Sequence, residues 1–330
     1  MTSYKDIQRA TGLSLATISK YYNGRNVLEA NREAIKAAAL ELDFRPNQQA
    51  RSLRSRRSRT VGVLLPAIDN DFHLTIVAGV EEALRPRGFS VIVAASPDPS
   101  DDSVNLLMDR MVDGIVAVTP PHDVPALRAA ASRVPVVMVD WHIDDLHADG
   151  VFLDNTAAGT LGARHLLDHG HRRIGFVGGE STIPSMRLRT EGFERALVSD
   201  GVEVDPTLER FVPLTVEAGY RATQELLARS PRPTGLFTAN YELTLGAVTA
   251  VNDSGLRIGR DISVVGFDSR ELAQALLPKL TVIVQPTRTI AKHAARLIAD
   301  HIEAGERPEP TIEYLEAQLV PGASVSRLDE

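Results

Sequence analysis

The stretch "TVGVLLPAIDNDFHLTIVAGVEEALRPRGFSVIVAA", residues 60–95, sets the pattern that most of the chain follows. A short apolar run at residues 60–66 predicts a buried strand, and the amphipathic residues 72–87 predict a helix behind it. A second apolar run at residues 90–95 predicts another strand. Because apolar strands that alternate with helices are typical of parallel sheets covered on both faces, this stretch predicts a doubly wound α/β fold.

The same alternation continues to residue 140 and restarts after residue 155. In the first series a helix is expected near residues 104–111, followed by the apolar runs "GIVAV" and "VPVVMVD". In the second series, helices are expected at 155–169, 189–200, 216–229 and 243–254, and the apolar runs are "RIGFVGG", "TGLFTA" and "ISVVGFD". Two such series predict two lobes with a ligand cleft at the carboxyl ends of their strands.

The last part of the chain is expected to cross back between the two lobes. The segments involved are "TVIVQP", a long helix over residues 287–304 and "TIEYLEAQLVP". This predicts an N-lobe of about 60–154 plus 286–309 and a C-lobe of about 155–285 plus 310–330.

Composition excludes several classes of protein. No run of eighteen apolar residues predicts a membrane span, and "MTSYKDIQRATG" at the N-terminus lacks the apolar stretch of a signal peptide. With no cysteine, the chain has neither disulfides nor a thiolate metal site. We therefore expect a cytoplasmic protein.

Charge is distributed unevenly along the chain. Residues 1–60 contain 12 Lys+Arg and 5 Asp+Glu, a net of +7, whereas the remaining residues contain 24 and 38, a net of -14. A basic head on an acidic body indicates that the head binds a polyanion. A solvated basic tail would show the same charge, so the residue pattern has to decide.

The basic head is typical of a helix-turn-helix. In "SYKDIQRATGLSLATISKYYNG", Ser3 and Asp6 form a capping signal, Gly12 allows a tight turn, and Ser14 caps a second helix. A third helix is expected at about residues 30–43. Two short helices joined by a glycine turn are the unit that lays its second helix in the DNA major groove. Any three-helix bundle gives this pattern, but the adjacent arginine run favours DNA binding.

Consecutive blocks of the whole chain resemble the LacI (lactose and galactose repressor) family of bacterial transcription regulators. The blocks are "KDIQRATGLSLATISKYYNG", "RPNQQARSLRSRRSRTVGVLLP", "MVDGIV", "VPVVMVD", "GARHLLDHGHRRIGFVGG", "RTEGFERAL", "EAGY", "RPTGLFTAN", "DISVVGFD" and "LTVIVQP". The resemblance implies a headpiece at 1–46, a hinge at 47–59 and a two-lobed, periplasmic-binding-protein-like effector and dimerisation domain at 60–330. It further implies a homodimer that represses transcription at a pseudo-palindromic operator, under control of a small polar effector such as a sugar.

The resemblance also places DNA contacts in the head and hinge. The implied residues are Ser3, Tyr4, Leu15, Ala16, Thr17, Ser19, Lys20, Asn23, Asn47, Ala50, Leu53 and Arg54. Residues 47–55 would form a hinge helix only on the operator, because about eight residues are too few for a stable helix and the neighbouring arginines repel one another. Leu53 would then insert into the minor groove as an apolar wedge. The alternative is that Leu53 packs against the body, which is uncommon for a leucine flanked by arginines.

Effector contacts carried over from the family lie at strand ends. They are Asp69, Phe72, Asp140, Trp141, Arg187, Arg189, Leu214, Asn240, Tyr241, Asp268 and Gln285. Their amide, carboxylate and guanidinium groups suit a polyhydroxylated ligand, and the aromatic rings suit stacking. Arg187 and Arg189 together suggest a clamp for an anionic ligand. The chain departs from the family at Asp71, which adds an acid, and at Tyr241, which replaces a carboxylate.

The sequence disfavours three other functions. His165, His169 and His171 resemble a metal site, but no carboxylate or cysteine completes it, so packing and capping are favoured. No nucleophile–base pair is evident, so we expect neither an enzyme nor a cofactor. A solute-binding protein of a sugar transport system has the same lobes, but it needs a signal peptide and lacks the basic head.

Overall fold

The structure is a computed structural model that describes residues 2–22, 26–44, 57–68, 70–118, 121–140, 142–143, 145–268, 270–305 and 309–328. The chain forms two compact units, Met1–Arg59 and Thr60–Glu330. Each unit is described by itself below.

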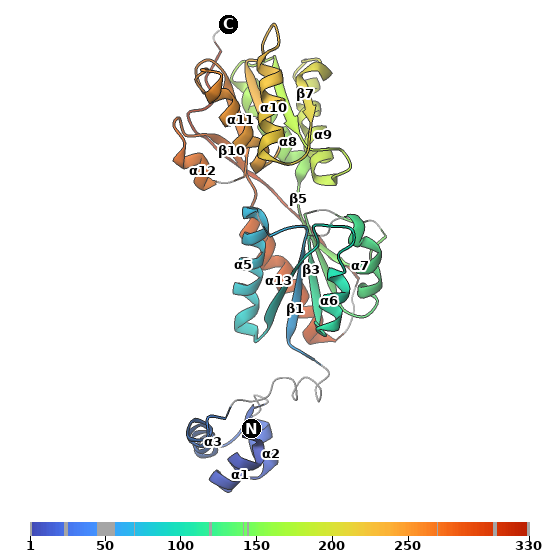
Figure 1. Cartoon of the computed structure of the whole chain (residues 1–330), viewed down its shortest axis with the longest axis vertical. Coiled ribbons are helices and arrows are strands. Elements are labelled where there is room, and N and C mark those ends of the chain that lie inside the picture. The colour runs from blue at the N-terminus through green and yellow to red at the C-terminus, as the bar shows by residue number, and fades with distance from the viewer. Residues whose placement is uncertain are drawn as a thin grey trace. The chain divides into compact units, whose positions relative to one another are not determined.

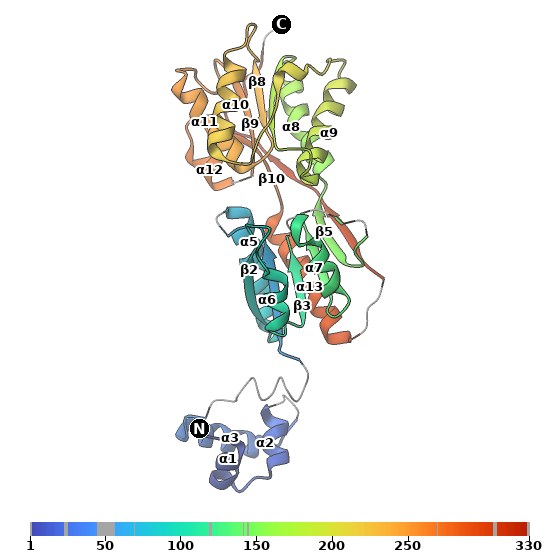
Figure 2. The ribbon, with the colours of Figure 1, turned by 45° about the vertical axis from the view of Figure 1, so that its right-hand side comes forward.

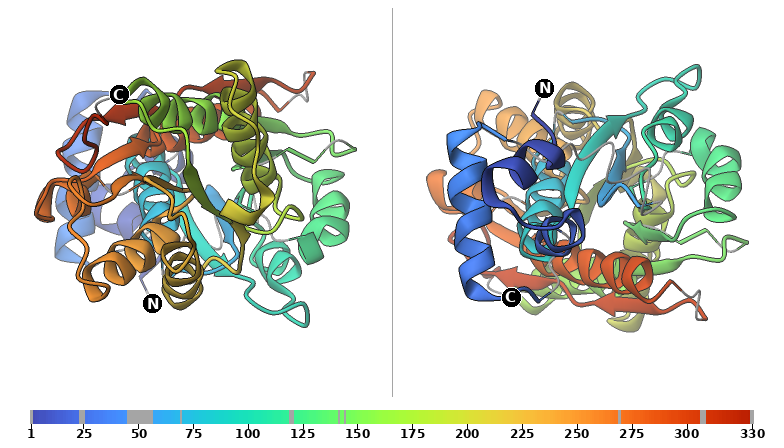
Figure 3. Two further views of the ribbon diagram at one scale, coloured as in Figure 1. Left: turned by 90° about the horizontal axis from the view of Figure 1, so that it is seen from above. Right: turned by 90° about the horizontal axis from the view of Figure 1, so that it is seen from below.

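The first unit consists of three helices, α1 (Tyr4–Thr11), α2 (Leu15–Tyr22) and α3 (Glu29–Glu41). They run in different directions (Figure 3, right) around a small core of Ile7, Ile18, Ile35, Ala38 and Phe44. The predicted turn is confirmed: Gly12 has a φ of 69° and its N–H bonds to the carbonyl of Gln8.

Both predicted caps in this unit are present. The Asp6 carboxylate accepts hydrogen bonds from the amide and the hydroxyl of Ser3, each at 2.8 Å. Ser14 Oγ accepts the amide of Thr17 at 3.1 Å, which fixes the start of α2. Short-range sequence signals therefore determine where these helices begin.

The second unit contains two six-stranded sheets, one in each lobe (Figure 1). The N-lobe sheet has the order β11-β5-β4-β3-β1-β2 and is parallel throughout. Its strands are β1 (Thr60–Leu65), β2 (Ser90–Ala95), β3 (Gly114–Ala117), β4 (Val136–Val139), β5 (Asp149–Leu153) and β11 (Ile312–Leu315). The C-lobe sheet has the order β12-β10-β9-β8-β6-β7, and only β12 is antiparallel to its neighbour. Its strands are β6 (Ile174–Gly178), β7 (Glu209–Phe211), β8 (Gly235–Thr238), β9 (Ser263–Phe267), β10 (Thr281–Val284) and β12 (Gln318–Val320).

Helices cover both faces of each sheet, which explains why the strands are apolar on both sides. In the N-lobe, α5 (Asp71–Leu84) and α13 (Thr287–Ala304) cover one face, and α6 (Ser103–Asp109) and α7 (Val124–Ala131) cover the other. In the C-lobe, α8 (Asn155–Asp168) and α9 (Pro184–Ser199) lie opposite α10 (Val216–Leu227) and α11 (Tyr241–Asp253), as Figure 2 shows. The short α12 (Arg270–Ala275) and three 3-10 turns, Arg85–Arg87, Pro121–Asp123 and Pro206–Leu208, complete the unit. These layers confirm the predicted fold class.

The lobe boundaries differ from the prediction at one place. The chain crosses between the lobes three times: after β5, after β10 and between β11 and β12. β11 pairs with β5 in the N-lobe, so the expected assignment of residues 310–315 to the C-lobe is wrong. β11 is an edge strand whose exposed and half-buried residues alternate, and such a pattern does not specify which sheet the strand joins. Among the helices of the described chain, none is long and apolar enough to cross a membrane.

Candidate functional site

A cleft of about 1120 Å³ lies between the two lobes, at the carboxyl ends of their strands. Pro66, Val118 and Asp140 follow N-lobe strands, and Asn240, Asp268 and Gln285 follow C-lobe strands. Ligands of open α/β sheets bind at such strand ends, because loops and helix N-termini converge there. The apolar wall of the cleft is formed by Phe72, Val118, Ile183, Met186, Leu214 and Val284.

Arg189 forms the floor of the cleft and is only 2% exposed. Its Nε donates to Asn155 Oδ1 at 2.8 Å, and its Nη1 donates to the carbonyl of Ala239 at 2.6 Å. The guanidinium carbon lies 3.8 Å from the centre of the Phe267 ring. These contacts hold the guanidinium plane in one orientation, as a rigid donor toward the cleft requires.

Two carboxylates face this guanidinium. Burial raises the pKa of Asp140, and burial raises the pKa of Asp268 to about 6 even though Arg189 opposes both shifts. Gln285 Nε2 donates to both oxygens of Asp268, at 2.9 and 3.1 Å. Two carboxylates therefore lie within the electrostatic influence of one buried guanidinium, so these three groups together are net negative when both carboxylates are ionised.

The backbone at both aspartates is strained. Asp140 has a φ of 77° and Asp268 a φ of 63°, in the left-handed region that non-glycine residues seldom occupy. Such strain is typical of functional sites, where it aims a side chain that a relaxed strand end would direct elsewhere. Both carboxylates follow a strand of their own lobe, so the strain directs them into the shared cleft.

The N-termini of two helices flank the cleft. Asn70 caps α5 by accepting the amide of His73 at 2.9 Å, and Asn240 caps α11 by accepting the amide of Leu243 at 2.9 Å. Glu242 accepts hydrogen bonds from the side-chain amides of both asparagines. Neither Asn70 nor Glu242 is expected from the sequence, although Glu242 directly follows Tyr241, where the family's carboxylate is missing.

The structure brings most of the predicted effector residues together. Those that line the cleft are Phe72, Asp140, Arg189, Leu214, Asn240, Tyr241, Asp268 and Gln285. Asp69 and Trp141 lie outside the described residues.

Arg187 requires a correction. It does not line the cleft; it is half exposed and pairs with Glu191 at 2.7 Å. Residues two apart on a helix point in different directions, so Arg187 cannot share a ligand with the buried Arg189. The anion clamp expected from these two arginines is therefore wrong.

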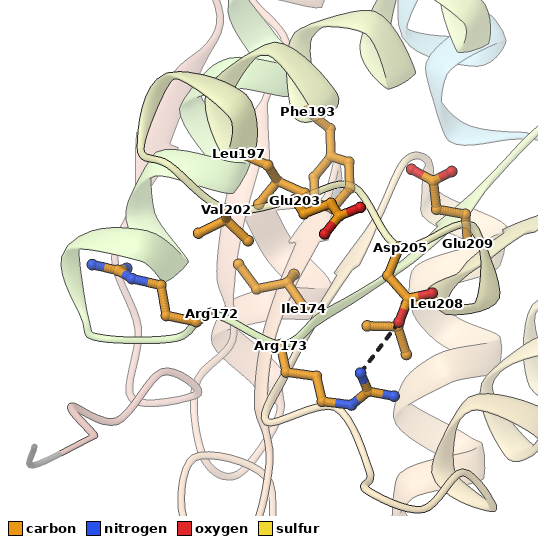
Figure 4. A pocket seen from close by; sticks show the side chains of 10 residues that line it. All are labelled: Arg172, Arg173, Ile174, Phe193, Leu197, Val202, Glu203, Asp205, Leu208 and Glu209. Carbon is orange, nitrogen blue, oxygen red and sulfur yellow. Dashed lines mark hydrogen bonds and ion pairs between the residues drawn. The ribbon is translucent and has the colours of Figure 1, made fainter.

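A second, smaller cavity of about 100 Å³ lies at the opposite end of the C-lobe strands, between β6, α9 and the turn before β7 (Figure 4). Arg173 pairs there with Asp205 at 3.2 Å. Glu209 Oε1 is buried without a hydrogen-bond partner, and burial, followed by the charges of Glu194 and Asp205, raises the pKa of Glu209 to about 7. This cavity has less than a tenth of the volume of the cleft, so the cleft is the candidate effector site.

The predicted histidine group serves local packing. The rings of His165 and His169 lie 4.4 Å apart, and His169 Nδ1 contacts the carbonyl of His165 at 2.7 Å. His171 is bonded to Thr234 and to the carbonyl of Ser326, each at 3.0 Å. Within the described part of the chain, no group of three or more metal-binding side chains is assembled.

The helical unit presents part of the predicted DNA surface on α2. Leu15, Ala16 and Lys20 are exposed there, and Ser19 is half-buried. The Thr17 hydroxyl contacts Ser14 Oγ at 2.9 Å, and the Ser3 hydroxyl contacts Asp6. The ring of Tyr4 stacks on Tyr22, with ring centres 5.3 Å apart. The remaining predicted contacts, Asn23, Asn47, Ala50, Leu53 and Arg54, lie outside the described residues.

Comparisons with known proteins agree with this arrangement. A family model described as a periplasmic binding protein-like domain matches residues 163–325. The ribose operon repressor of Haemophilus influenzae is 31% identical over 92% of this chain and 92% of its own length. A lac repressor dimer bound to its operator and an anti-inducer superposes with a TM-score of 0.86, at 27% identity, over 98% of this chain and 99% of that one. A transcriptional regulator from Enterococcus faecium with bound ribose superposes with a TM-score of 0.75, at 29% identity, over 82% of this chain and 100% of that one.

Proposed function

Because the chain belongs to the LacI/GalR family of transcriptional repressors, we propose that its interlobe cleft binds a neutral sugar that controls operator binding. The chain is a repressor with a small-molecule effector. Its relatives include ribose operon repressors, and a ribose-bound structure matches 82% of this chain, so D-ribose is the first candidate. The sugar is bound and released unchanged, without a catalytic step.

The observation that carries this proposal is the charge of the cleft floor. Asp140 and Asp268 accept hydrogen bonds, Arg189 donates them, and Gln285 and Asn240 do both. Sugar hydroxyls also donate and accept, so a neutral sugar satisfies all of these groups at once. The charged side chains that line the whole cleft are five carboxylates, Asp71, Asp140, Glu242, Asp268 and Glu271, and three guanidinium groups, Arg189, Arg270 and Arg288. An anionic ligand would add a further negative charge to this net negative lining, and the repulsion disfavours it.

Isothermal titration of the full chain tests this choice with a matched pair of ligands, D-ribose and D-ribonate. We expect D-ribose to bind at least about tenfold more tightly, since an uncompensated charge in a partly buried site costs more than 1.4 kcal/mol. Equal affinity for the sugar and its acid would refute the argument from charge. If a purine base bound more tightly than any sugar, the proposed effector would be a purine and not a sugar.

On the DNA side, we propose a homodimer that reads a pseudo-palindromic operator with one α2 helix in each half-site. The exposed residues Leu15, Ala16 and Lys20 lie on one surface of that helix, where small residues permit close approach to base edges. Tyr4, Ser3 and Asn23 would contact the DNA backbone beside it. The operator-bound lac repressor dimer supports this arrangement.

The coupling between ligand and DNA is proposed to run through residues 47–59, most of which lie outside the described residues. Leu53, with Asn47, Ala50 and Arg54 beside it, would enter the minor groove at the centre of the operator. We propose a headpiece at 1–46, a hinge at 47–59 and the two lobes from residue 60. Thermodynamic linkage requires reciprocity: if the effector changes the affinity of the protein for its operator by some factor, the operator changes the affinity of the protein for the effector by the same factor.

A further inference from the structure

Two helix N-termini, one from each lobe, converge on a single carboxylate at the mouth of the cleft. α5 belongs to the N-lobe and begins after Asn70, and α11 belongs to the C-lobe and begins after Asn240. Each asparagine uses its Oδ1 to accept a backbone amide of its own helix, at 2.9 Å. Because this cap fixes which amide atom faces the helix, the Nδ2 of each asparagine must point away from it.

Both of these Nδ2 groups donate to Glu242. Asn240 Nδ2 lies 2.5 Å from Glu242 Oε2 within the C-lobe, and Asn70 Nδ2 lies 3.3 Å from Glu242 Oε1 across the cleft. The second bond joins the two lobes directly. Helices of 14 and 13 residues also place positive partial charge at their N-termini, which a carboxylate between them stabilises.

We propose that Glu242 is an interlobe latch and a positioning residue for effector binding. Its carboxylate favours the closed arrangement of the lobes before any ligand arrives, and it holds the Asn240 amide at the edge of the cleft. The latch is inferred from the contacts alone, whereas the positioning role rests on the proposed function. Since closure assembles floor groups from both lobes, loss of the latch lowers the fraction of chains that are ready to bind.

The chain offers a way to break the latch without disturbing the helix caps. Asn70→Asp keeps an oxygen to cap α5, but it replaces the donor facing Glu242 with a second carboxylate. Glu242→Gln removes the charge and leaves one oxygen for two amide donors. Because the bond to Asn240 is the shorter one, we expect the oxygen to stay there and the new amide to face Asn70. In the double variant the two groups exchange roles: the Gln amide donates to the Asp carboxylate, while its oxygen still accepts from Asn240.

Interlobe distances measure closure directly. The chain has no cysteine, so Asp109→Cys on α6 and Thr249→Cys on α11, both at exposed positions, allow two spin labels to be attached to the full-length protein. Without ligand, we expect one dominant distance in the parent and in the double variant. In each single variant, we expect a second, longer distance from chains with open lobes. The ratio of closed to open chains should fall on the order of tenfold, because each variant loses one charge-assisted hydrogen bond.

Glu217→Gln serves as the control, because it removes an exposed carboxylate from the same lobe outside the cleft lining. It should leave the distances unchanged. Single variants with the parent distance distribution, or a double variant as open as the singles, would overturn the latch. Titration with D-ribose should show binding weakened by up to about tenfold in the singles and restored in the double variant. Unchanged ribose affinity in opened singles would overturn the positioning role. If ribose does not bind the parent, the ligand-free distances still decide the latch, so the two proposals fail separately.

Discussion

Protonation of Asp268 should weaken effector binding as the pH falls. The pKa of this carboxyl is about 6 in the unliganded cleft, raised from 3.8 by burial. A sugar hydroxyl that donates to the carboxylate favours its ionised form, so binding lowers this pKa. If binding lowers the pKa of Asp268 well below 5, the dissociation constant rises by a factor of about two at pH 6 and about tenfold at pH 5, relative to pH 7.5.

The same shift predicts the stability of the Asp268→Asn variant. The pKa of Asp268 is higher in the folded chain than in the unfolded chain. The stability that this carboxyl contributes is therefore fully present below pH 3.8 and is lost as the pH rises through about 6. Ionised Asp268 therefore destabilises the free protein at pH 8. The shift corresponds to about 3 kcal/mol, and screening by cleft water reduces that to about 1–2 kcal/mol. Asparagine also tolerates the positive φ at this position.

Titration calorimetry with D-ribose from pH 5 to 7.5, together with urea unfolding at pH 8, checks both effects. Asp268→Asn should unfold at higher urea concentration than the parent, while binding ribose more weakly and without the pH dependence. A parent whose ribose affinity is the same at pH 5 and pH 7.5 would refute the reasoning. An Asn variant that keeps the pH dependence would assign it to another group.

Three further predictions concern packing, DNA binding and the small cavity. A Cβ on Gly159 would lie 2.1 Å from the carbonyl oxygen of Arg189, so Gly159→Ala should push α8 and α9 apart. We expect this variant to lose about 2–4 kcal/mol of unfolding free energy in urea and to bind ribose more weakly. A variant as stable as the parent would contradict this close packing. Lys20→Ala should weaken binding to a selected operator more than to random DNA in fluorescence anisotropy, whereas equal losses would make Lys20 a phosphate contact. Because the pKa of Glu209 is raised from 4.5 to about 7, its stabilising contribution is lost as the pH rises through that range. Glu209→Gln should therefore melt like the parent at pH 4 and at a higher temperature at pH 8, and a constant difference across this range would assign the effect to packing.

Local signals in the sequence predicted many of the elements. The bounds of α13 match the expected helix at residues 287–304, because Pro286 precedes it and Gly305 ends it with a φ of 71°. α9 begins five residues before the expected start at residue 189, because Pro184 occupies its first turn, where proline is well tolerated. The sequence does not predict β5 or β7. β5 (DGVFL) begins with Asp149 and Gly150, and β7 (ERF) has only three residues, two of them charged, so neither shows the apolar run of a buried strand.

Contacts between distant residues could not be predicted in this way. Arg189 and Arg187 are neighbours in the sequence, yet one lies beneath the cleft and the other pairs with Glu191 outside it. The bond between Asn70 and Glu242 joins residues 172 positions apart, and neither residue type signals it alone. The left-handed backbone at Asp140 and Asp268 likewise becomes apparent only when the strands are placed.

Linkage between ligand and operator is the most direct test of the account. Operators selected from random duplex DNA can be titrated with the full chain by fluorescence anisotropy, with and without saturating D-ribose, and ribose can then be titrated into the free chain and the operator complex. We expect ribose to change operator affinity about 5- to 150-fold, and the operator to change ribose affinity by the same factor. Ribose that binds the chain but leaves operator affinity unchanged would contradict the account.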